Sequence, residues 1–192
     1  MPSPELICRI AIAINIVLFA AMNAYFDMRL KRRGIDPVGT APIAKGAFVV
    51  GKMAMVVCWL VLIVQVCGLN FSGFDPILKL QWVALVLFTL GNVFVGLSQS
   101  HLGDSGKIGL PTDEPTELRT RGIYQVSRNP MYVGFHLVSA ASCLYTLNVV
   151  AIVSAVVAIG IHHRIILSEE RFLAKRFGRA WDAYKARVRR YM

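Results

Sequence analysis

Apolar residues form five long stretches in this chain, and the short polar segments between them contain most of the charged side chains. A membrane-spanning helix needs about 20 mostly apolar residues, because the hydrocarbon core of a bilayer is about 30 Å thick. The sequence therefore predicts five spanning helices, at residues 6–25, 48–68, 81–97, 131–147 and 149–167. Little more than Asn148 separates the last two stretches, which predicts a tight helical hairpin.

The C-terminal tail has a different pattern. From Glu170 onward, apolar residues recur at steps of three and four with basic residues between them: Phe172, Leu173, Phe177, Trp181, Tyr184, Val188 and Tyr191. This spacing predicts an amphipathic helix on the cytoplasmic leaflet, acting either as an anchor or as a wall of the active site. The expected fold is all-α and polytopic. Residues 1–97 would hold three spanning helices and a basic cytoplasmic loop, and residues 98–192 a loop, the hairpin and the interfacial helix, which together form the catalytic region.

Composition and charge support a membrane protein and orient it. Of the 192 residues 56% are hydrophobic, and the mean hydropathy is +0.56. Segment 27–52 is strongly basic, whereas segment 69–80 carries only Asp75 and Lys79. The positive-inside rule then predicts a cytoplasmic first loop, an external N-terminus and a cytoplasmic C-terminus. A cleaved signal peptide is disfavoured, because Tyr25-Phe26-Asp27 is a poor cleavage site.

The net charge of +10 could suggest nucleic acid, but orientation and attraction to anionic lipids account for it, and no nucleic-acid motif is present. We therefore expect membrane lipids as partners and no nucleic acid. The oligomeric state is open, since Gly91 and Gly96 suit internal packing as well as dimerisation.

Several kinds of site are disfavoured by spacing. The four cysteines lie in apolar stretches without a C-x-x-C pair, and the adjacent His162 and His163 point to different helix faces, so we expect no metal. Lys107 lies among Gly103, Gly106 and Gly109, but this spacing does not match a phosphate-binding P-loop. No G-x-G-x-x-G is present either, so a nucleotide-like cofactor would not use a Rossmann site.

Polar chemistry concentrates at two ends of apolar stretches. Asn129 is a good helix N-cap and Pro130 suits the first helical position, so this corner could hold an anionic group. Tyr132 follows within one turn, and Glu169 and Glu170 end the last stretch. Together these groups would surround a small zwitterion. The polar segment 98–122 is either a solvated linker or a loop that folds over this site.

The motifs of the second half resemble those of a known family. In order they are Leu102-Gly103, E-L-x-x-x-G-I-Y from Glu117 to Tyr124, S-R-N-P-M-Y from Ser127 to Tyr132, and E-E-R-F-L-x-x-x-F-G-x-x-W-x-x-Y from Glu169 to Tyr184. This order is similar to that of isoprenylcysteine carboxyl methyltransferases and related phospholipid methyltransferases. The resemblance covers residues 97–192.

The resemblance implies a membrane-embedded enzyme that uses S-adenosyl-L-methionine and encloses it between the last spans and the cytoplasmic loop. The implied cofactor-binding residues are His101, Gly103, Tyr124, Arg128, Asn129, Pro130, Tyr132, Glu169 and Glu170. Asn129 stands where the family usually has histidine, which keeps helix capping but removes a ring that titrates near neutrality.

Methyl transfer mainly requires alignment of the reacting groups and exclusion of water. The resemblance favours a carboxylate acceptor, and Arg164 is the candidate cation that would hold it. An amine acceptor would instead need a base to remove its proton, such as Glu169 or His101. His101 could also be an ordinary interfacial residue. The acceptor is expected to be lipophilic, and a small hydrophobic carboxylate, thiol or phenol would also fit a pocket that opens to the lipid. Two alternatives remain: a membrane reductase using NADPH, similar to sterol reductases, and a non-catalytic membrane protein on the same scaffold.

Overall fold

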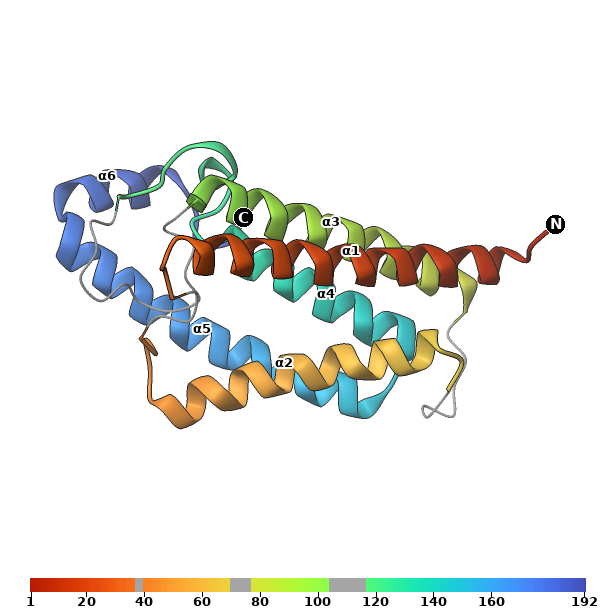
Figure 1. Ribbon diagram of the computed structural model, residues 1–192. Helices are drawn as coiled ribbons and strands as arrows, with labels where there is room; N and C mark the ends of the chain where they lie inside the picture. The colour runs from red at the N-terminus through yellow and green to blue at the C-terminus, as the bar shows by residue number, and fades with distance from the viewer. Residues whose placement is uncertain (37–39, 70–76, 104–116) are drawn as a thin grey trace.

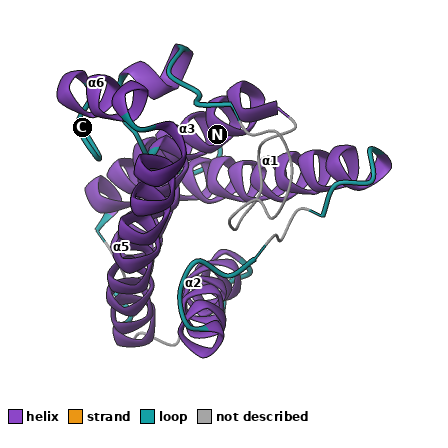
Figure 2. Cartoon of the chain, turned by 90° about the vertical axis from the view of Figure 1, so that its left-hand side faces the viewer, coloured by secondary structure: helices purple, strands orange, loops and turns teal. Residues whose placement is uncertain are grey.

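The structure, a computed structural model, describes residues 1–36, 40–69, 77–103 and 117–192 (Figure 1). Within these ranges every regular element is helical (Figure 2), which confirms the all-α prediction. The elements are α1 (Pro4–Arg32), α2 (Lys45–Val66), α3 (Leu78–Leu102), the 3₁₀ helix η2 (Gly122–Gln125), α4 (Pro130–Thr146), α5 (Val149–Phe177) and α6 (Arg179–Arg187). The glycines and the lysine considered for a phosphate loop at 106, 107 and 109, and most of the polar segment 98–122, lie outside the described residues.

Four of the helices, α1, α2, α3 and α5, are long and apolar enough to cross a membrane. α4 matches the fourth predicted stretch within a residue, but its 17 residues extend only about 26 Å at the usual helical rise. Large apolar side chains such as Val153, Val156 and Val157 on α5 are exposed, as expected of a surface that contacts lipid.

The short helix α4 lies in the middle of the bundle, where it packs against α2, α3 and α5 (Figure 1). Its approach to α3 depends on glycine. A Cβ atom placed on Gly134 would lie 2.8 Å from the carbonyl oxygen of Gly91, and one on Gly91 would lie 2.9 Å from that of Gly134. Close backbone contact of this kind is a common means of helix association in membranes. For Gly91, internal packing is thus what the structure shows.

Aromatic side chains and amides join α1 to its neighbours. The Phe19 ring lies edge-on to the rings of Trp59 and Phe135, with centroids 4.9 Å and 6.4 Å away. Farther along α1, Asn23 accepts a hydrogen bond of 2.9 Å from the Gln99 amide of α3. Amide pairs of this kind satisfy polar groups that would be costly to leave unpaired in lipid.

The predicted hairpin between α4 and α5 is confirmed. Leu147 ends α4 in the left-handed conformation, with φ 44°. Asn148 then caps α5, because its Oδ1 accepts hydrogen bonds from the backbone N–H groups of Val150 (2.8 Å) and Ala151 (3.4 Å). Two residues therefore reverse the chain.

The tail differs from the single amphipathic helix expected from Glu170. α5 continues ten residues past its apolar end and stops at Phe177, because Gly178 takes φ +48° and breaks the helix. The remaining nine-residue α6 folds back toward the start of α4, so that the C-terminus lies near that end of the bundle (Figure 1). Hydropathy marks the membrane core, whereas the helix end is set by the glycine.

Candidate active site

The turn that leads into α4 is held by Ser127 and Asn129. Ser127 Oγ accepts a hydrogen bond of 3.1 Å from the Asn129 N–H and donates one of 3.1 Å to the carbonyl of Arg190. Asn129 occupies the N-cap position and Pro130 begins the helix, as predicted, but the Asn129 side chain does not cap it. Its amide instead donates to Glu170 Oε1 (3.3 Å) and to the Arg190 carbonyl (3.2 Å). The anion expected at this corner is therefore a carboxylate of the chain itself.

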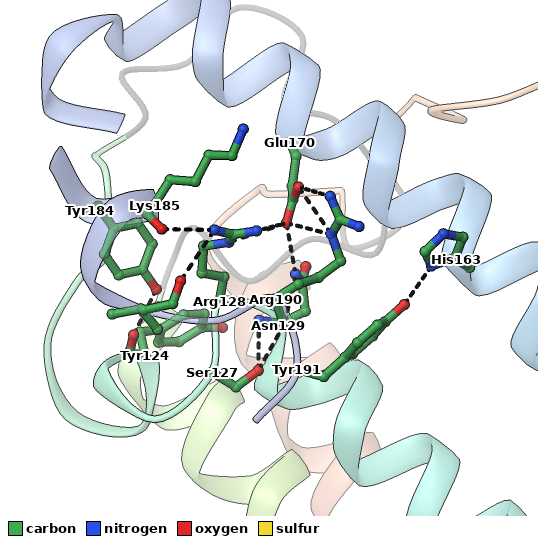
Figure 3. A network of polar contacts seen from close by, with 11 residues as sticks. Tyr124, Ser127, Arg128, Asn129, His163, Glu170, Tyr184, Lys185, Arg190 and Tyr191 are labelled. Atoms are coloured by element: carbon green, nitrogen blue, oxygen red, sulfur yellow. Dashed lines mark hydrogen bonds and ion pairs between the residues drawn. The ribbon is translucent and has the colours of Figure 1, made fainter. Parts of the chain in front are cut away.

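Glu170 is the centre of a buried ionic cluster (Figure 3). Arg128 donates to its Oε1 through Nη2 (3.0 Å) and Nε (3.2 Å), and Arg190 donates to its Oε2 through Nη2 (2.9 Å) and Nε (3.2 Å). With the Asn129 contact, both carboxylate oxygens are fully occupied by groups of this chain. We call Arg128, Asn129, Glu170 and Arg190 the Glu170 clamp. It fastens the start of α4, the end of α5 and the segment after α6 to one another.

Arg128 also orders the tail directly. Its Nη1 donates to the carbonyls of Lys185 (3.2 Å) and Val188 (3.1 Å), and its guanidinium lies 5.7 Å from the centroid of the buried Trp181 ring. α6 is thus bound to the loop before α4 and is more than a membrane anchor. Hydrogen bonding to Glu170 raises the pKa of Arg190, so this cation stays charged at any ordinary pH.

Two tyrosine contacts complete the attachment of the tail (Figure 3). Tyr184 of α6 donates a hydrogen bond of 2.6 Å to the carbonyl of Tyr124 in η2, and the Tyr191 hydroxyl lies 2.7 Å from His163 Nδ1. Burial raises the pKa of Tyr184 to about 12 and also raises the pKa of Tyr124. Both phenols are therefore neutral, and Tyr124 lies at the joint between η2 and α6.

Glu169 has a different environment from its neighbour. It is half-buried, and among the described residues its hydrogen-bond partner is Tyr132, whose hydroxyl donates to Oε1 at 2.9 Å. Among the described residues no hydrogen bond reaches its other oxygen, Oε2. Consecutive residues of a helix do not share a face, so Glu170 enters the clamp while Glu169 turns toward α4.

The remaining predicted residues are more scattered. His101 is exposed in the last turn of α3, with Nδ1 2.7 Å from the Leu97 carbonyl and its ring against Gly122, where an added Cβ would lie 2.3 Å from Nε2. Gly103 follows α3 with φ +56°. Arg164 is exposed on α5 and takes no part in the clamp as far as the chain is described. Its catalytic role stays a prediction, as do the cofactor contacts and the absence of a metal.

A cavity of about 370 Å³ lies between α1, α2, α3 and α4. Its wall is mostly apolar and aromatic, including Phe19, Trp59 and Phe135, and its polar lining residues are Asn23, Asp27 and Gln99. Gly103 also lines it, which connects the cavity to the end of α3 where His101 lies. This cavity was not predicted from the sequence, because its lining residues come from four separate helices and only their packing brings them together.

Arg190 was missed for a similar reason. In the sequence it is one of many basic residues in a basic tail, and nothing local distinguishes it from Arg187 or Arg189, which are exposed. Its pairing with Glu170 depends on the reversal at Gly178. The only available signal was that a carboxylate at the end of an apolar span needs a cationic partner.

Comparison with known proteins identifies a matching family and a similar protein. The model of the phospholipid methyltransferase family matches residues 80–180, which is more than half of the chain. Protein-S-isoprenylcysteine O-methyltransferase B of Arabidopsis thaliana is 32% identical over 127 residues, covering 60% of this chain and 62% of that protein. The aligned part is thus less than two thirds of the relative's length. The region matched by the family model includes α4, α5 and three of the four clamp residues.

Proposed function

Since the chain belongs to the phospholipid methyltransferase family, we propose that it uses S-adenosyl-L-methionine to methylate a lipophilic acceptor within the membrane. The family and the apolar helices make it an integral, multi-pass membrane protein of a methyltransferase family. The observation that carries the proposal is the position of Tyr132 and Glu169. They lie beside the clamp, at the end that charge placement assigns to the cytoplasm. Tyr132 is on α4, whose next turn contributes Phe135 to the apolar cavity, and Glu169 is on α5.

The residues present fit such a cofactor. Glu169 Oε2 can accept hydrogen bonds from hydroxyl or amino groups, and two buried imidazole nitrogens nearby, His136 Nε2 and His162 Nδ1, have no hydrogen-bond partner among the described residues. We assign Glu169 and Tyr132 to holding the cofactor, with Tyr124, His101 and Gly103 at the border of its site. The clamp would keep α5 and the loop before α4 at a fixed separation.

S-adenosyl-L-methionine, when bound, supplies a methyl group on a cationic sulfur. The protein's own contribution is to align the acceptor with that methyl group and to exclude water, because no covalent residue is needed for a displacement of this kind. The apolar cavity would take the tail of the acceptor from the bilayer. The tail of this protein, fixed by the clamp, would close the cytoplasmic side. We keep the predicted orientation, with the C-terminus in the cytoplasm.

The acceptor group that we propose is an isoprenylcysteine-type carboxylate, supported by the likeness to the Arabidopsis relative. Arg164 would be its cation. One observation favours a phospholipid amine instead: the charged residue that lines the cavity is an acid, Asp27, which would attract an ammonium group and repel a carboxylate. Transfer of a labelled methyl group to N-acetyl-S-farnesylcysteine or to phosphatidylethanolamine in vesicles distinguishes the two.

Calorimetry on detergent-purified protein tests the cofactor. We expect S-adenosylmethionine and S-adenosylhomocysteine to bind with dissociation constants on the order of micromolar, and Glu169→Gln to weaken both about tenfold or more. Glu117→Gln, at a carboxylate that pairs with Arg119 on the surface, is the matched control and should bind as the wild type does. A folded sample that binds neither compound, or that binds NADPH alone, would overturn the proposal.

A further inference from the structure

A cluster of four rings lies between α4 and α5, on the side of Glu169 that faces away from the cytoplasm. Tyr132, Phe135 and His136 come from α4, and His162 comes from α5, two turns or about 10 Å before Glu169 along the helix. The centroid of the His162 ring is 5.3 Å from that of Tyr132, 6.2 Å from that of Phe135 and 5.6 Å from that of His136, to which it is nearly parallel at 20°. We call these four residues the ring cluster.

Two polar atoms of the ring cluster, one on each histidine, have no hydrogen-bond partner among the described residues. His162 is 5% exposed, and its Nδ1 is buried without a hydrogen-bond partner among the described residues. The same holds for Nε2 of His136. An unpaired polar group in a low-dielectric interior has a substantial free-energy cost, and ionisable residues inside a membrane are by default associated with function. Packing alone would be served equally well by leucine or phenylalanine.

The ring cluster lies between the two parts of the proposed site. Phe135 lines the apolar cavity and its ring centroid lies 6.0 Å from that of Trp59, another lining residue. On the other side, Tyr132 donates its hydroxyl to Glu169. A group transferred from a cofactor at Glu169 to an acceptor in the cavity would therefore pass the ring cluster.

The chemistry of the ring cluster suits a compact cation. Aromatic faces attract cations, most strongly where water is excluded, and the carboxyl group of Glu169 is bonded to the Tyr132 hydroxyl. The cluster contains no arginine or lysine, and a buried imidazole without an acidic partner is most stable uncharged. The sulfur of S-adenosylmethionine is cationic, whereas that of S-adenosylhomocysteine is neutral. Apart from that methyl group and its charge, the two compounds are the same.

We propose that Tyr132, Phe135, His136 and His162 form the subsite for the cationic sulfur of the cofactor, and that they make the protein bind the methylated cofactor in preference to its demethylated product. This inference rests on the proposed function, because it assumes that an adenosyl cofactor binds beside Glu169. The preference would help product to leave after each turnover. His162 is the residue whose removal tests the subsite most directly, since it contacts the other three rings.

The test is the ratio of the affinities for S-adenosylmethionine and S-adenosylhomocysteine, measured by calorimetry on the detergent-purified full chain. We expect His162→Leu to lower this ratio about tenfold, mainly by weakening S-adenosylmethionine. His162→Phe, which keeps an aromatic face, should retain the ratio within about threefold of the wild type. Both ligands are measured on the same sample, and the fitted stoichiometry gives the fraction that is folded and able to bind, so misfolding is seen separately from a change in the ratio.

His163→Leu is the matched control. His163 is the next residue on α5, but it bonds to Tyr191 (Figure 3) and is not one of the four ring-cluster residues. Its substitution should therefore leave the ratio unchanged even if it lowers stability. An unchanged ratio in His162→Leu, or an equal fall in His162→Leu and His162→Phe, would overturn the inference while leaving the proposed function intact. Failure of the wild type to bind either ligand would overturn the proposed function and this inference with it.

Discussion

Two adjacent carboxylates at the end of α5 have different partners, and this difference decides how each should respond to substitution. Glu170 accepts hydrogen bonds from two arginines and an asparagine, whereas Glu169 accepts one from Tyr132. From the sequence, both carboxylates were expected to face the helix start at Asn129 and Pro130. In the structure Glu170 connects parts of the chain, whereas Glu169 bonds to Tyr132 through one of its two oxygens.

Loss of the Glu170 charge should strongly destabilise the protein. The Arg128 and Glu170 side chains are 6% and 9% exposed, so Glu170→Gln leaves a buried guanidinium without its counter-charge. Removing one partner of a buried ion pair costs about 3–5 kcal/mol, and we expect a loss of that order in the free energy of unfolding. Denaturant titration in detergent, followed by Trp fluorescence, measures it.

The surface pair Glu117–Arg119 gives the comparison for Glu170→Gln. Its nitrogen and oxygen are 3.3 Å apart, but the side chains are 75% and 41% exposed, and exposed ion pairs contribute only about 0–1 kcal/mol. Glu117→Gln should therefore leave the unfolding transition almost unchanged. Similar losses in both variants would mean that the clamp has no special structural role.

The hydroxyl of Tyr132 can be removed without changing the ring. Tyr132→Phe takes away the hydrogen bond to Glu169, and an intramolecular hydrogen bond contributes about 0.5–1.5 kcal/mol to stability. We expect a loss toward the lower end of that range, because Glu169 is only half-buried and water can partly replace the donor. Tyr25→Phe, at an exposed tyrosine of α1, should be neutral in the same unfolding assay. Equal effects would contradict the role given to this hydroxyl.

At the scale of the element, the close contact between α3 and α4 depends on Gly91 and Gly134, which have no side chain. Gly134→Ala would place a Cβ atom 2.6 Å from Val95 Cγ2 and 2.8 Å from the Gly91 carbonyl oxygen, which is backbone and cannot rotate away. The helices must separate, and overpacking of this kind costs about 1–3 kcal/mol. The denaturant concentration at the midpoint of unfolding should therefore be lower for Gly134→Ala than for the wild type.

Gly160→Ala is the control for Gly134→Ala. Gly160 is also inside a helix, but a Cβ added there meets nothing within 4 Å. Alanine is favoured over glycine in a helix interior by about 0.5–1 kcal/mol, so this variant should be neutral or slightly more stable. If both alanine variants behaved alike, the difference between the two glycines would be one of helix propensity and not of packing.

The elements show which features the sequence could predict. The hydrophobic stretches located all five long helices, and the turn at Asn148 followed from the shortness of the gap. The ends of α1, α3 and α5 extend beyond the predicted stretches because polar residues continue a helix once it has left the bilayer core. The site residues Arg128, Tyr132 and Glu169 were found through motif and position. Arg190, Phe135 and the role of His162 were not, because each depends on contacts between helices that no local spacing encodes.

For the whole molecule, the two termini lie at opposite ends of the bundle (Figure 1), as the predicted five passes would require. Charge placement predicts the N-terminal end outside and the tail inside. Under this orientation the C-terminal end of α2 is external. It carries Cys67, which is exposed, whereas Cys8 and Cys58 are buried and Cys143 is half-buried. The chain therefore has its own reporter of orientation.

A membrane-impermeant maleimide should label Cys67 in intact cells or right-side-out vesicles, and Cys67→Ser should remove most of that labelling, because the other thiols are less accessible. Lys175→Cys on the Cys67→Ser background places a thiol in the exposed last turn of α5, at the end where the clamp lies. This thiol should react only after the membrane is permeabilised. The reverse pattern would place Glu169 and the clamp outside the cytoplasm, where adenosyl cofactors are not supplied, and would contradict the methyltransferase proposal together with the orientation. Labelling of both thiols in sealed vesicles would instead contradict an odd number of passes. The helix that then fails to cross the membrane would be α4, which at about 26 Å is the shortest of the five long helices.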